Sequence, residues 1–391
     1  MMGHTLIRGQ ALYNGEQYLK DEPAALLISG DRILSLGREA LAATDADVNV
    51  IECPGQTLMP GMIDCHNHLS LDPRLPDYLL GMNDPLPELT LRAVQTMEAD
   101  LMSGVTTSRC LGDKAFLDVH CRKAQDEGRL SGPRLKVATR GIRALHGHGF
   151  VGYAVDGPEN VRTVVRENVA AGADLIKIYL TGSLKGPQGL PCTFSEAEVQ
   201  MLVAEAHRAG LPVATHCIGG PGLDLALTCG IDVIEHGYFM TPKQIEAMAG
   251  GPAWLVLTPS IFFTDARLQT LHGNLKELHL EQRDEVGSVM AQVVNADIRW
   301  AIGTDGMHGQ LAVEVAHVVG FGAKPADAIA GVTTRAAELC GLAEDIGRLA
   351  KGKLADVIGV EGDPLQDVSA LRQVKTVIQG GRVVKAGPSR S

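Results

Sequence analysis

The stretch Met59–Leu69, M-P-G-M-I-D-C-H-N-H-L, begins with apolar residues and ends in two histidines that one residue separates. After the bend at Pro60-Gly61 its pattern predicts an extended strand, in which successive side chains point to opposite faces. Asp64, His66 and His68 would then share one face. Two neutral imidazoles on one face of a strand end can hold the same metal ion. Two surface histidines near a turn are the alternative that this pair alone leaves open.

The composition is that of a globular α/β protein: 391 residues, 45% hydrophobic and 21% charged, with few aromatic residues. This length suffices for one large domain and a smaller one. The net charge of −11 and the lack of a lysine- and arginine-rich run argue against nucleic acid as a partner. The first residues form no apolar signal core, and no apolar run is long enough for a membrane span, so we expect no membrane association.

Cysteine usage predicts the compartment. The eight cysteines are scattered and include no C-x-x-C pair. A secreted protein that depends on disulfides would show a regular cysteine framework, so we predict reduced cysteines and a cytoplasmic location. The sequence contains no coiled-coil heptad repeat from which an oligomeric state could be predicted. A homo-oligomer and a monomer are therefore both alternatives.

Short strands separated by turns are predicted at both ends of the chain. Between Thr5 and Val50, apolar runs alternate with polar turns such as Asn14-Gly15. The C-terminal runs G-K-L-A-D-V-I-G-V and V-K-T-V-I-Q-G-G-R-V-V have the same texture, with Gly380-Gly381 as a hairpin turn. We therefore predict that residues 1–58 and 350–391 together form a small β-sandwich domain.

The middle of the chain, residues 59–349, alternates strand-like and helical patterns. The strand-like runs include L-K-V-A-T-R, D-L-I-K-I-Y-L, L-P-V-A-T-H, D-V-I-E-H, A-W-L-V-L-T and R-W-A-I-G-T-D. The clearest helix has Ser195 as its N-cap, Glu198 completing a capping box, and Gly210 at its end. This alternation predicts an α/β fold with a parallel sheet, and its length favours a closed (β/α)8 TIM barrel over an open doubly wound sheet. No G-x-G-x-x-G follows an early strand, so dinucleotide binding has no support.

Polar residues stand at the ends of these strands, where catalytic groups of barrels lie. Lys177 occupies the middle of an apolar run, and a lysine is rarely buried there without a role, although it could also reach the barrel rim. Further runs end in His216, His236 and Asp305. Each alone could be a capping or core residue. Together with the His-x-His pair they predict a metal centre.

With these motifs the chain resembles the amidohydrolase superfamily, in the group related to imidazolonepropionase and to amidohydrolase-type prolidases. The matching stretches are P-G-M-I-D-C-H-N-H, G-A-D-L-I-K-I-Y, T-H, I-E-H-G, G-T-D-G and a G-H-G at Gly147–Gly149, and the resemblance spans essentially the whole chain. It implies a TIM barrel, a small β-sandwich, and two divalent metal ions, with zinc expected, bridged by a carboxylated lysine. The implied ligands are His66, His68 and Asp305 for one ion, His216 and His236 for the other, and Lys177 as the bridge.

The resemblance implies hydrolysis by a metal-bridging hydroxide, because two metal ions lower the pKa of a shared water. Asp305 would take the proton of that water and pass it to the leaving amine. We predict cleavage of a C–N amide bond in a small polar substrate: a dipeptide, an N-acyl amino acid or a cyclic amide. Phosphoester or lactone hydrolysis, deamination and a non-catalytic relative of the fold are the alternatives. Lys177 favours the two-metal hydrolase over a one-metal deaminase.

Candidate substrate-binding residues lie in two connections, R-G-I-R-A-L-H-G-H-G-F after the third strand and Y-L-T-G-S-L-K-G after the next. His148 could stabilise the carbonyl oxygen as it becomes negative, which makes it a catalytic candidate as well. Tyr179 and Arg143 are predicted to contact the substrate. Arg140, Arg143 and Lys185 could equally be solvated surface charges.

Two long connections, Asp72–Pro87 and Ser260–Asp284, are each predicted to act as a lid, a binding loop or an interaction surface.

The chain departs from the family pattern directly after the His216 motif. Cys217-Ile218 stand where members that cleave dipeptides often carry an aromatic residue. Dipeptides therefore stay only one of several candidate amides.

Overall fold

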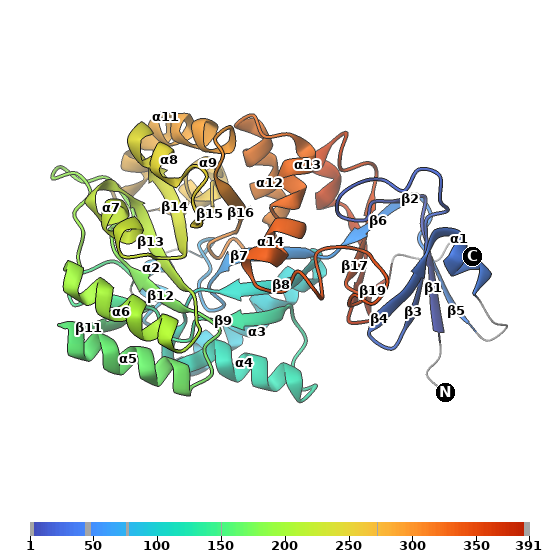
Figure 1. Cartoon of the computed structure of the whole chain (residues 1–391), viewed down its shortest axis with the longest axis horizontal. Helices are drawn as coiled ribbons and strands as arrows, with labels where there is room; N and C mark the ends of the chain where they lie inside the picture. Colours follow the sequence, from blue (N-terminus) through green and yellow to red (C-terminus); the bar gives the residue numbers. More distant parts are fainter. Residues whose placement is uncertain (1–3, 44–47, 76–77, 150, 272, 387–391) are drawn as a thin grey trace.

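The computed structural model describes residues 4–43, 48–75, 78–149, 151–271 and 273–386. Two sheets at one end of the molecule contain the strands of both chain termini (Figure 1). The first has the order β4 (Arg32–Leu36), β3 (Ala25–Ser29), β1 (His4–Arg8) and β5 (Asn49–Glu52). The second has the order β19 (Arg382–Lys385), β18 (Val374–Gln379), β17 (Val357–Glu361), β6 (Gln56–Pro60) and β2 (Ala11–Leu12).

The two termini meet in the second of these sheets. Strand β6 pairs antiparallel with β17, from Gln56 opposite Glu361 to Pro60 opposite Val357. The predicted hairpin is present between β18 and β19, where Gly380 and Gly381 both adopt positive φ, at 52° and 73°. Two successive residues with φ > 0 suit the twist of a tight hairpin, and glycine reaches that conformation at no steric cost.

One apolar cluster holds the terminal strands together. It contains Ile7, Leu58, Val357 and Ile378, all fully buried. These residues come from β1, β6, β17 and β18, which belong to both sheets. Burial of such side chains is the main favourable contribution to folding, so the terminal strands depend on each other for stability.

Among the described residues, the strands of the middle region are parallel and fall into two sheets. The three-stranded sheet has the order β7 (Met62–Asn67), β8 (Val105–Cys110) and β9 (Arg134–Val137). The seven-stranded sheet has the order β11 (Tyr153–Val155), β10 (Ile142–Ala144), β12 (Ile176–Tyr179), β13 (Val213–Gly219), β14 (Val233–Phe239), β15 (Trp254–Leu257) and β16 (Arg299–Ile302). The predicted parallel α/β architecture is therefore confirmed.

Backbone hydrogen bonds link the two sheets at both edges. The amides of Thr304 and Asp305 donate to the carbonyl of His66, at 3.1 and 2.8 Å, and so connect the residues after β16 to β7. At the other edge, the amide of Asp174 donates to the carbonyl of Val137 at 2.8 Å, which connects β9 to the residues before β12.

The interpretation of residues 140–150 as a connection after the third strand was wrong in part. Ile142–Ala144 form strand β10, which pairs in parallel with β12 and with β11. The run I-R-A is too short to be recognised from its own pattern. Its pairing with β12 decides its conformation, since strand formation depends more on neighbouring strands than on local preference.

Helices separate the parallel strands (Figure 1). The helix predicted after Ser195 is present as α6 (Glu196–Arg208), and the Glu198 carboxylate accepts from the Ser195 amide at 2.8 Å, as a capping box requires. The helices that follow the strands are α3 (Leu86–Met102), α4 (Leu117–Asp126), α5 (Pro158–Ala170), α6 (Glu196–Arg208), α7 (Gly220–Thr228), α8 (Pro242–Met248), α11 (Leu275–Val294), α12 (Leu311–Gly320), α13 (Pro325–Ala330) and α14 (Thr334–Leu339). Helix α1 (Gly37–Ala42) packs beside the first terminal sheet.

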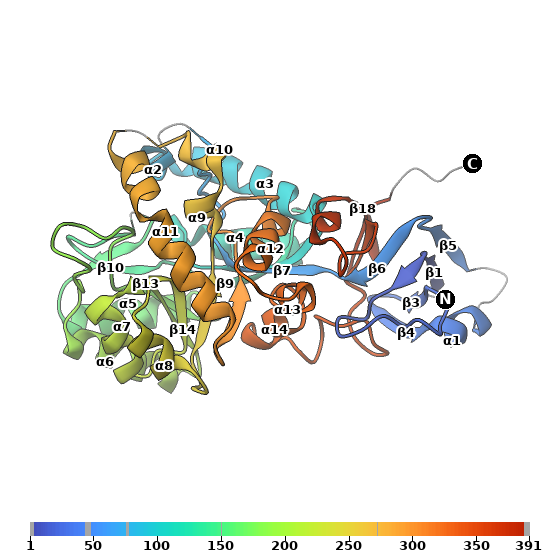
Figure 2. The same ribbon diagram turned by 90° about the horizontal axis from the view of Figure 1, so that it is seen from above.

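The two long connections carry short helices and contact each other (Figure 2). Helix α2 (Tyr78–Gly81) lies in the first connection, and α9 (Ser260–Phe263) and α10 (Asp265–Leu268) lie in the second. The Arg267 side chain donates to the Tyr78 hydroxyl at 2.7 Å, and Thr270 donates to the Pro73 carbonyl at 2.8 Å.

Two further predictions concern the whole chain. All eight cysteines are free thiols, as predicted. Across the described ranges, no helix has both the length and the hydrophobicity that a membrane span needs.

We predict that Ile378→Ala lowers the free energy of unfolding by about 2–5 kcal/mol, because it removes a fully buried side chain from the cluster that joins both termini. Val383→Ala is the matched control, since Val383 pairs with Ile378 but is 48% exposed. The control should change the free energy by at most about 0.5 kcal/mol. Urea denaturation measures both, and equal effects would contradict this account of the terminal sheets.

Candidate metal centre and active site

The side chains at the end of strand β7 point to opposite faces of the strand in turn, as the sequence predicted. His66 and His68 point their Nε2 atoms toward the Asp305 carboxylate, at 3.2 and 3.6 Å from its Oδ1. On the opposite side, the Asn67 amide donates to Asp100 at 2.9 Å, and Cys65 packs in an apolar cluster. The alternative of two surface histidines is excluded, since His66 and His68 are only 1% and 4% exposed.

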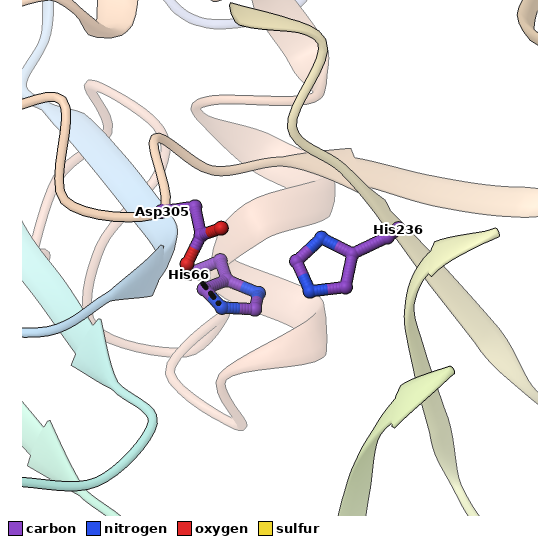
Figure 3. Close-up of side chains that lie close together, drawn as sticks. All are labelled: His66, His236 and Asp305. Carbon is purple, nitrogen blue, oxygen red and sulfur yellow. Dashed lines mark ion pairs between the residues drawn. The ribbon is translucent and has the colours of Figure 1, made fainter. Parts of the chain in front are cut away.

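Three side chains converge as a potential metal site. The ligand atoms of His66, His236 and Asp305 all lie within 4.8 Å of one another. Figure 3 shows the three side chains pointing toward one another, with the His66–Asp305 pair dashed. They come from β7, β14 and the turn after β16, so the arrangement exists only in the folded chain.

The remaining predicted ligands extend this cluster. The rings of His216 and His236 are 4.5 Å apart, between centroids, and those of His66 and His236 are 4.7 Å apart. His148 lies 4.4 Å from His216, and Tyr179 lies 6.0 Å from both His148 and His216. Four histidines predicted as ligands, and the predicted catalytic His148, thus occupy one site.

Lys177 is buried beside the same cluster. Its side chain is fully inaccessible, and its Nζ has no hydrogen-bond partner among the described residues. The alternative in which this lysine reaches the barrel rim is therefore wrong. Nζ lies 5.1 Å from the centroid of the Tyr179 ring. Burial lowers the pKa of Lys177 to about 8, against the opposing effects of the Glu235 and Asp305 carboxylates.

A layer of hydrogen bonds orients the imidazoles. His66 Nδ1 lies 2.8 Å from a Glu235 carboxylate oxygen, and His68 Nδ1 lies 2.7 Å from the Gly112 carbonyl. An acceptor at Nδ1 fixes the proton there and leaves the Nε2 lone pair free for a metal. His216 is turned the other way, because its Nε2 lies 3.0 Å from the Gly182 carbonyl and its Nδ1 is left free.

Burial keeps most of these rings neutral. It lowers the pKa of His68 to about 3, and it lowers the pKa values of His216 and His236 well below the ordinary range. In His66, burial also lowers the pKa, but the Asp305 and Glu235 carboxylates raise it above its ordinary value. Neutral imidazoles are the form that binds divalent metals, so the protein environment prepares this set of donors.

Sequence reasoning missed the buried pair formed by Glu235 and Arg109. Glu235 is fully buried and accepts from Arg109 at 2.9 Å with one oxygen, while the other contacts His66. Arg109 also donates to the Cys65 carbonyl at 2.9 Å. Glu235 lies within the I-E-H-G stretch, so a signal was present, but its partners are far away in the sequence.

The Asp305 turn is locked onto β7. Strand β16 ends at Ile302, so Asp305 lies in the turn and not on the strand, with a positive φ of 52°. Thr304 donates to Asp64 through its hydroxyl at 2.6 Å and its amide at 3.1 Å. A Cβ at Gly303 would collide with the backbone of His66, so only glycine permits this close approach. A positive φ in a residue other than glycine, as in Asp305, is a backbone strain that is frequent at active sites.

A cavity of about 280 Å³ opens next to the histidine cluster. Its lining residues share a location around the strand ends and both long connections: His66, His68, Leu71, Pro73, Tyr78, Met82, His148, Gly149, Val151, Tyr179, Ser183, Leu184, His216, His236, Tyr238, Ile261, Arg267, Leu271, Leu275, His279 and Asp305. The side chains of His148 and Tyr179, both predicted to contact the substrate, thus line the cavity. Both long connections also form part of its wall.

The other predicted cationic residues have partners elsewhere. Arg143 donates to the carbonyls of Ala144 and Leu145, at 3.2 and 3.1 Å, and is not among the described residues that line the cavity. Arg140 pairs with Glu167 at 2.7 Å. Lys185 pairs with Glu285 at 2.9 Å. The substrate contact expected of Arg143 stays a prediction.

Parallel strands bring histidines to one cavity, which a carboxylate after the last strand also lines and beside which a lysine is buried. This arrangement defines an α/β protein with an enzyme-type active site. The profile of the Amidohydrolase family matches residues 57–384, so the chain belongs to this family of hydrolases. The family that the sequence motifs indicated is thereby confirmed.

Curated relatives cover most of the chain. Ochratoxinase of Aspergillus niger is 28% identical over 93% of this chain and 83% of its own length. Imidazolonepropionase of Colwellia psychrerythraea is 26% identical over 88% of this chain and 86% of its own length.

Solved structures share the fold along nearly their whole length. A Xaa-Pro dipeptidase with methionine bound in its active site superposes with a TM-score of 0.86 at 26% identity, covering 98% of this chain and all of that one. Aspergillus niger ochratoxinase superposes with a TM-score of 0.84 at 24% identity, covering 98% of this chain and 96% of its own.

We predict that Glu235→Gln destabilises the folded chain by about 3–5 kcal/mol, because it leaves the buried Arg109 without a counter-charge. It should also weaken metal binding about 10- to 100-fold through the lost contact with His66. Glu338→Gln is the control, since Glu338 pairs with Arg299 at 2.6 Å but is 54% exposed. Denaturation midpoints and metal titration measure the two effects. A Glu235→Gln protein as stable as the control would contradict the role of this pair.

Proposed function

We propose that this chain hydrolyses a C–N amide bond of a small polar substrate at a binuclear metal centre. The observation that carries the proposal is the convergence of the ligand atoms of His66, His236 and Asp305 within 4.8 Å of one another, beside a cavity. A buried lysine without a hydrogen-bond partner in the described part of the chain adds to it. Neutral imidazoles and one carboxylate are the donors that zinc prefers, so the residues fit a divalent metal.

The residues would be divided between two ions. His66, His68 and Asp305 would hold one ion, and His216 and His236 the other. When bound, such ions supply Lewis acidity that activates water and polarises a carbonyl group. Each of three rings uses one nitrogen in a hydrogen bond and keeps the other for an ion: Nε2 in His68 and His236, and Nδ1 in His216.

Lys177 is proposed to carry a carboxyl group that bridges the two ions. Its neutral amine would add carbon dioxide, forming an N–C bond and releasing one proton, which leaves an anionic carbamate. A pKa lowered to about 8 increases the fraction of free amine that can react. The buried Nζ without a partner supports this assignment, because burial of an unpaired ammonium group is costly.

Asp305 is proposed to move the proton. Its carboxylate faces the His66 and His68 rings and lines the cavity, so it can take a proton from the attacking water and give it to the leaving nitrogen. Burial raises its pKa, but the neighbouring imidazoles outweigh burial and lower it well below the ordinary value. Asp305 therefore starts as the base.

His148 and Tyr179 are proposed to contact the substrate. Burial lowers the pKa of His148 to about 4, so its ring is neutral near pH 7 and can donate one N–H to the carbonyl oxygen as this becomes negative. Tyr179 packs against Gly149, where a Cβ would lie 2.6 Å from the Tyr179 ring. The glycine of the G-H-G stretch thus allows the loop that carries His148 to approach Tyr179 closely.

The architecture that we propose for this function is a closed (β/α)8 barrel, residues 59–349, with a β-sandwich built from residues 1–58 and 350–391. The hydrogen bonds from Thr304 and Asp305 to His66, and from Asp174 to Val137, support closure. The shared cluster of Ile7, Leu58 and Ile378 supports the sandwich.

The names of the relatives support an amide as the substrate. One similar structure is a Xaa-Pro dipeptidase with methionine in its active site, and one relative is an imidazolonepropionase. We therefore propose a dipeptide, an N-acyl amino acid or a cyclic amide. The net charge of −11 favours small molecules over nucleic acid as partners.

Metal analysis combined with a substrate panel tests the function. The purified protein should contain two equivalents of divalent metal, and it should hydrolyse at least one of the dipeptides, N-acyl amino acids, lactams or cyclic ureas supplied. One equivalent with release of ammonia would indicate a deaminase instead. Activity confined to phosphoesters or lactones would mean that the substrate is an ester and not an amide. A metal-free inactive protein would indicate a non-catalytic relative.

We predict that Lys177→Ala loses metal and activity together, because the bridging group disappears. Small carboxylic acids should restore part of both by occupying the space of the missing group. Lys375→Ala is the control, as Lys375 is 41% exposed and pairs with Glu361. Metal content and turnover are measured side by side. A Lys177→Ala protein with two equivalents of metal and normal turnover would refute the bridge.

We predict that Asp305→Asn lowers turnover by about 10²–10⁴-fold while at least one metal ion stays bound, because an amide cannot accept the proton. Asp345→Asn is the control, since Asp345 is exposed and pairs with Arg32 at 2.8 Å. The measurement is kcat on the best substrate of the panel, together with metal content. A loss smaller than about tenfold would rule out Asp305 as the proton shuttle.

A further inference from the structure

The wall of the cavity contains one cationic side chain that the sequence analysis did not single out. Among the described lining residues, Arg267 is the single lysine or arginine. It lies in α10, within the second long connection, and is only 4% exposed. Three other cationic residues were suggested by the sequence as substrate contacts, but they bond elsewhere. Arg140 bonds to Glu167, Arg143 to backbone carbonyl groups, and Lys185 to Glu285.

The guanidinium group of Arg267 is incompletely satisfied. Its Nη2 donates to the Tyr78 hydroxyl at 2.7 Å, and the group lies 5.4 Å from the centroid of the Tyr78 ring. Nε and Nη1 are shielded from solvent and have no hydrogen-bond partner among the described residues. No acidic side chain of the described ranges forms an ion pair with it. A buried charge without an anionic partner is costly, and a bound anion would remove that cost.

The positive charge of Arg267 acts on the cavity. Burial lowers the pKa of His279 to about 4, and the next contribution in the same direction comes from Arg267. Burial raises the pKa of Tyr78, and Arg267 opposes this effect. Tyr238, whose ring lies 5.3 Å from that of His236, also experiences the charge of Arg267.

We propose that Arg267 is the carboxylate anchor of the substrate site, so that the preferred substrates are amides of amino acids with a free carboxylate. This inference rests on the proposed amide hydrolysis and narrows it to N-acyl amino acids and dipeptides. A guanidinium group can bind a carboxylate through two parallel N–H donors, which fixes its orientation as well as its position. Neutral cyclic amides would leave Arg267 unpaired and are disfavoured.

The rest of the wall fits the side chain of such a substrate. Leu71, Met82, Val151, Ile261 and Leu271 line the same cavity. An apolar side chain next to the anchored carboxylate would bury its surface against these residues. Asp305 and His148, the residues proposed to act on the scissile amide, line the same cavity as Arg267.

Two compound pairs test the anchor: N-acetyl-L-leucine with N-acetyl-L-leucinol, and N-acetyl-L-phenylalanine with N-acetyl-L-phenylalaninol. Each pair has the same amide and the same side chain, and differs in the carboxylate alone. In Arg267→Met, kcat/KM for the acids should fall about 10- to 100-fold, while the values for the alcohols change less than about threefold. Arg283→Met is the matched control, because Arg283 lies near α10 but bonds to Phe262 and Asp265.

Binding is measured separately from turnover. In the Asp305→Asn background, calorimetry with the same four compounds should show weaker binding of the acids alone when Arg267→Met is added. Equal binding of acids and alcohols, no binding of any compound, or an acid preference that survives Arg267→Met would overturn the anchor. Binding that depends on Arg267 without hydrolysis of any amide would keep the anchor and refute the proposed function. Hydrolysis of acids and alcohols with equal kcat/KM would keep the proposed function and refute the anchor.

Discussion

The joint between β7 and the turn after β16 is the constraint on which the active site depends. The amides of Thr304 and Asp305 both donate to the carbonyl of His66, and the Thr304 side chain is held by Asp64. The joint forms only because Gly303 has no side chain to collide with His66. It places a carboxylate opposite two imidazoles, although more than half of the chain separates them in the sequence.

Burial then sets the chemical state of the groups that this joint brings together. It favours the neutral forms of His68, His216 and Lys177, whose pKa values are lowered. Two carboxylates stay ionised in spite of burial, because the neighbouring imidazoles lower the pKa of Asp305, and Arg109 and His66 lower the pKa of Glu235. Against the effect of burial, these carboxylates in turn raise the pKa of His66 above its ordinary value. The result is a cluster of mostly neutral imidazoles beside fixed negative charges. This is the electrostatic arrangement that a divalent cation requires.

The two long connections complete the cavity from the opposite side. They are tied together by Arg267 with Tyr78 and by Thr270 with Pro73, so each restricts the other. The strand ends contribute most of the histidines, whereas the connections contribute apolar side chains together with Tyr78, His279 and the guanidinium group of Arg267. Such a division is expected when a rigid sheet supports the chemistry and loops determine which substrate fits.

The sequence by itself determined the parallel α/β architecture, the shared sheet of the termini, and the histidines, Lys177 and Asp305 that meet at the site. These follow from local rules: strand side chains alternate with period two, and histidines or carboxylates at strand ends share one edge of the sheet. The tertiary structure alone decided the short strand β10, the pair of Arg109 and Glu235, which are 126 residues apart, and the position of Arg267 in the cavity wall. Each of these depends on contacts between distant segments. Local patterns carry no information about such contacts, because the free energy that fixes them arises only when the chain has folded.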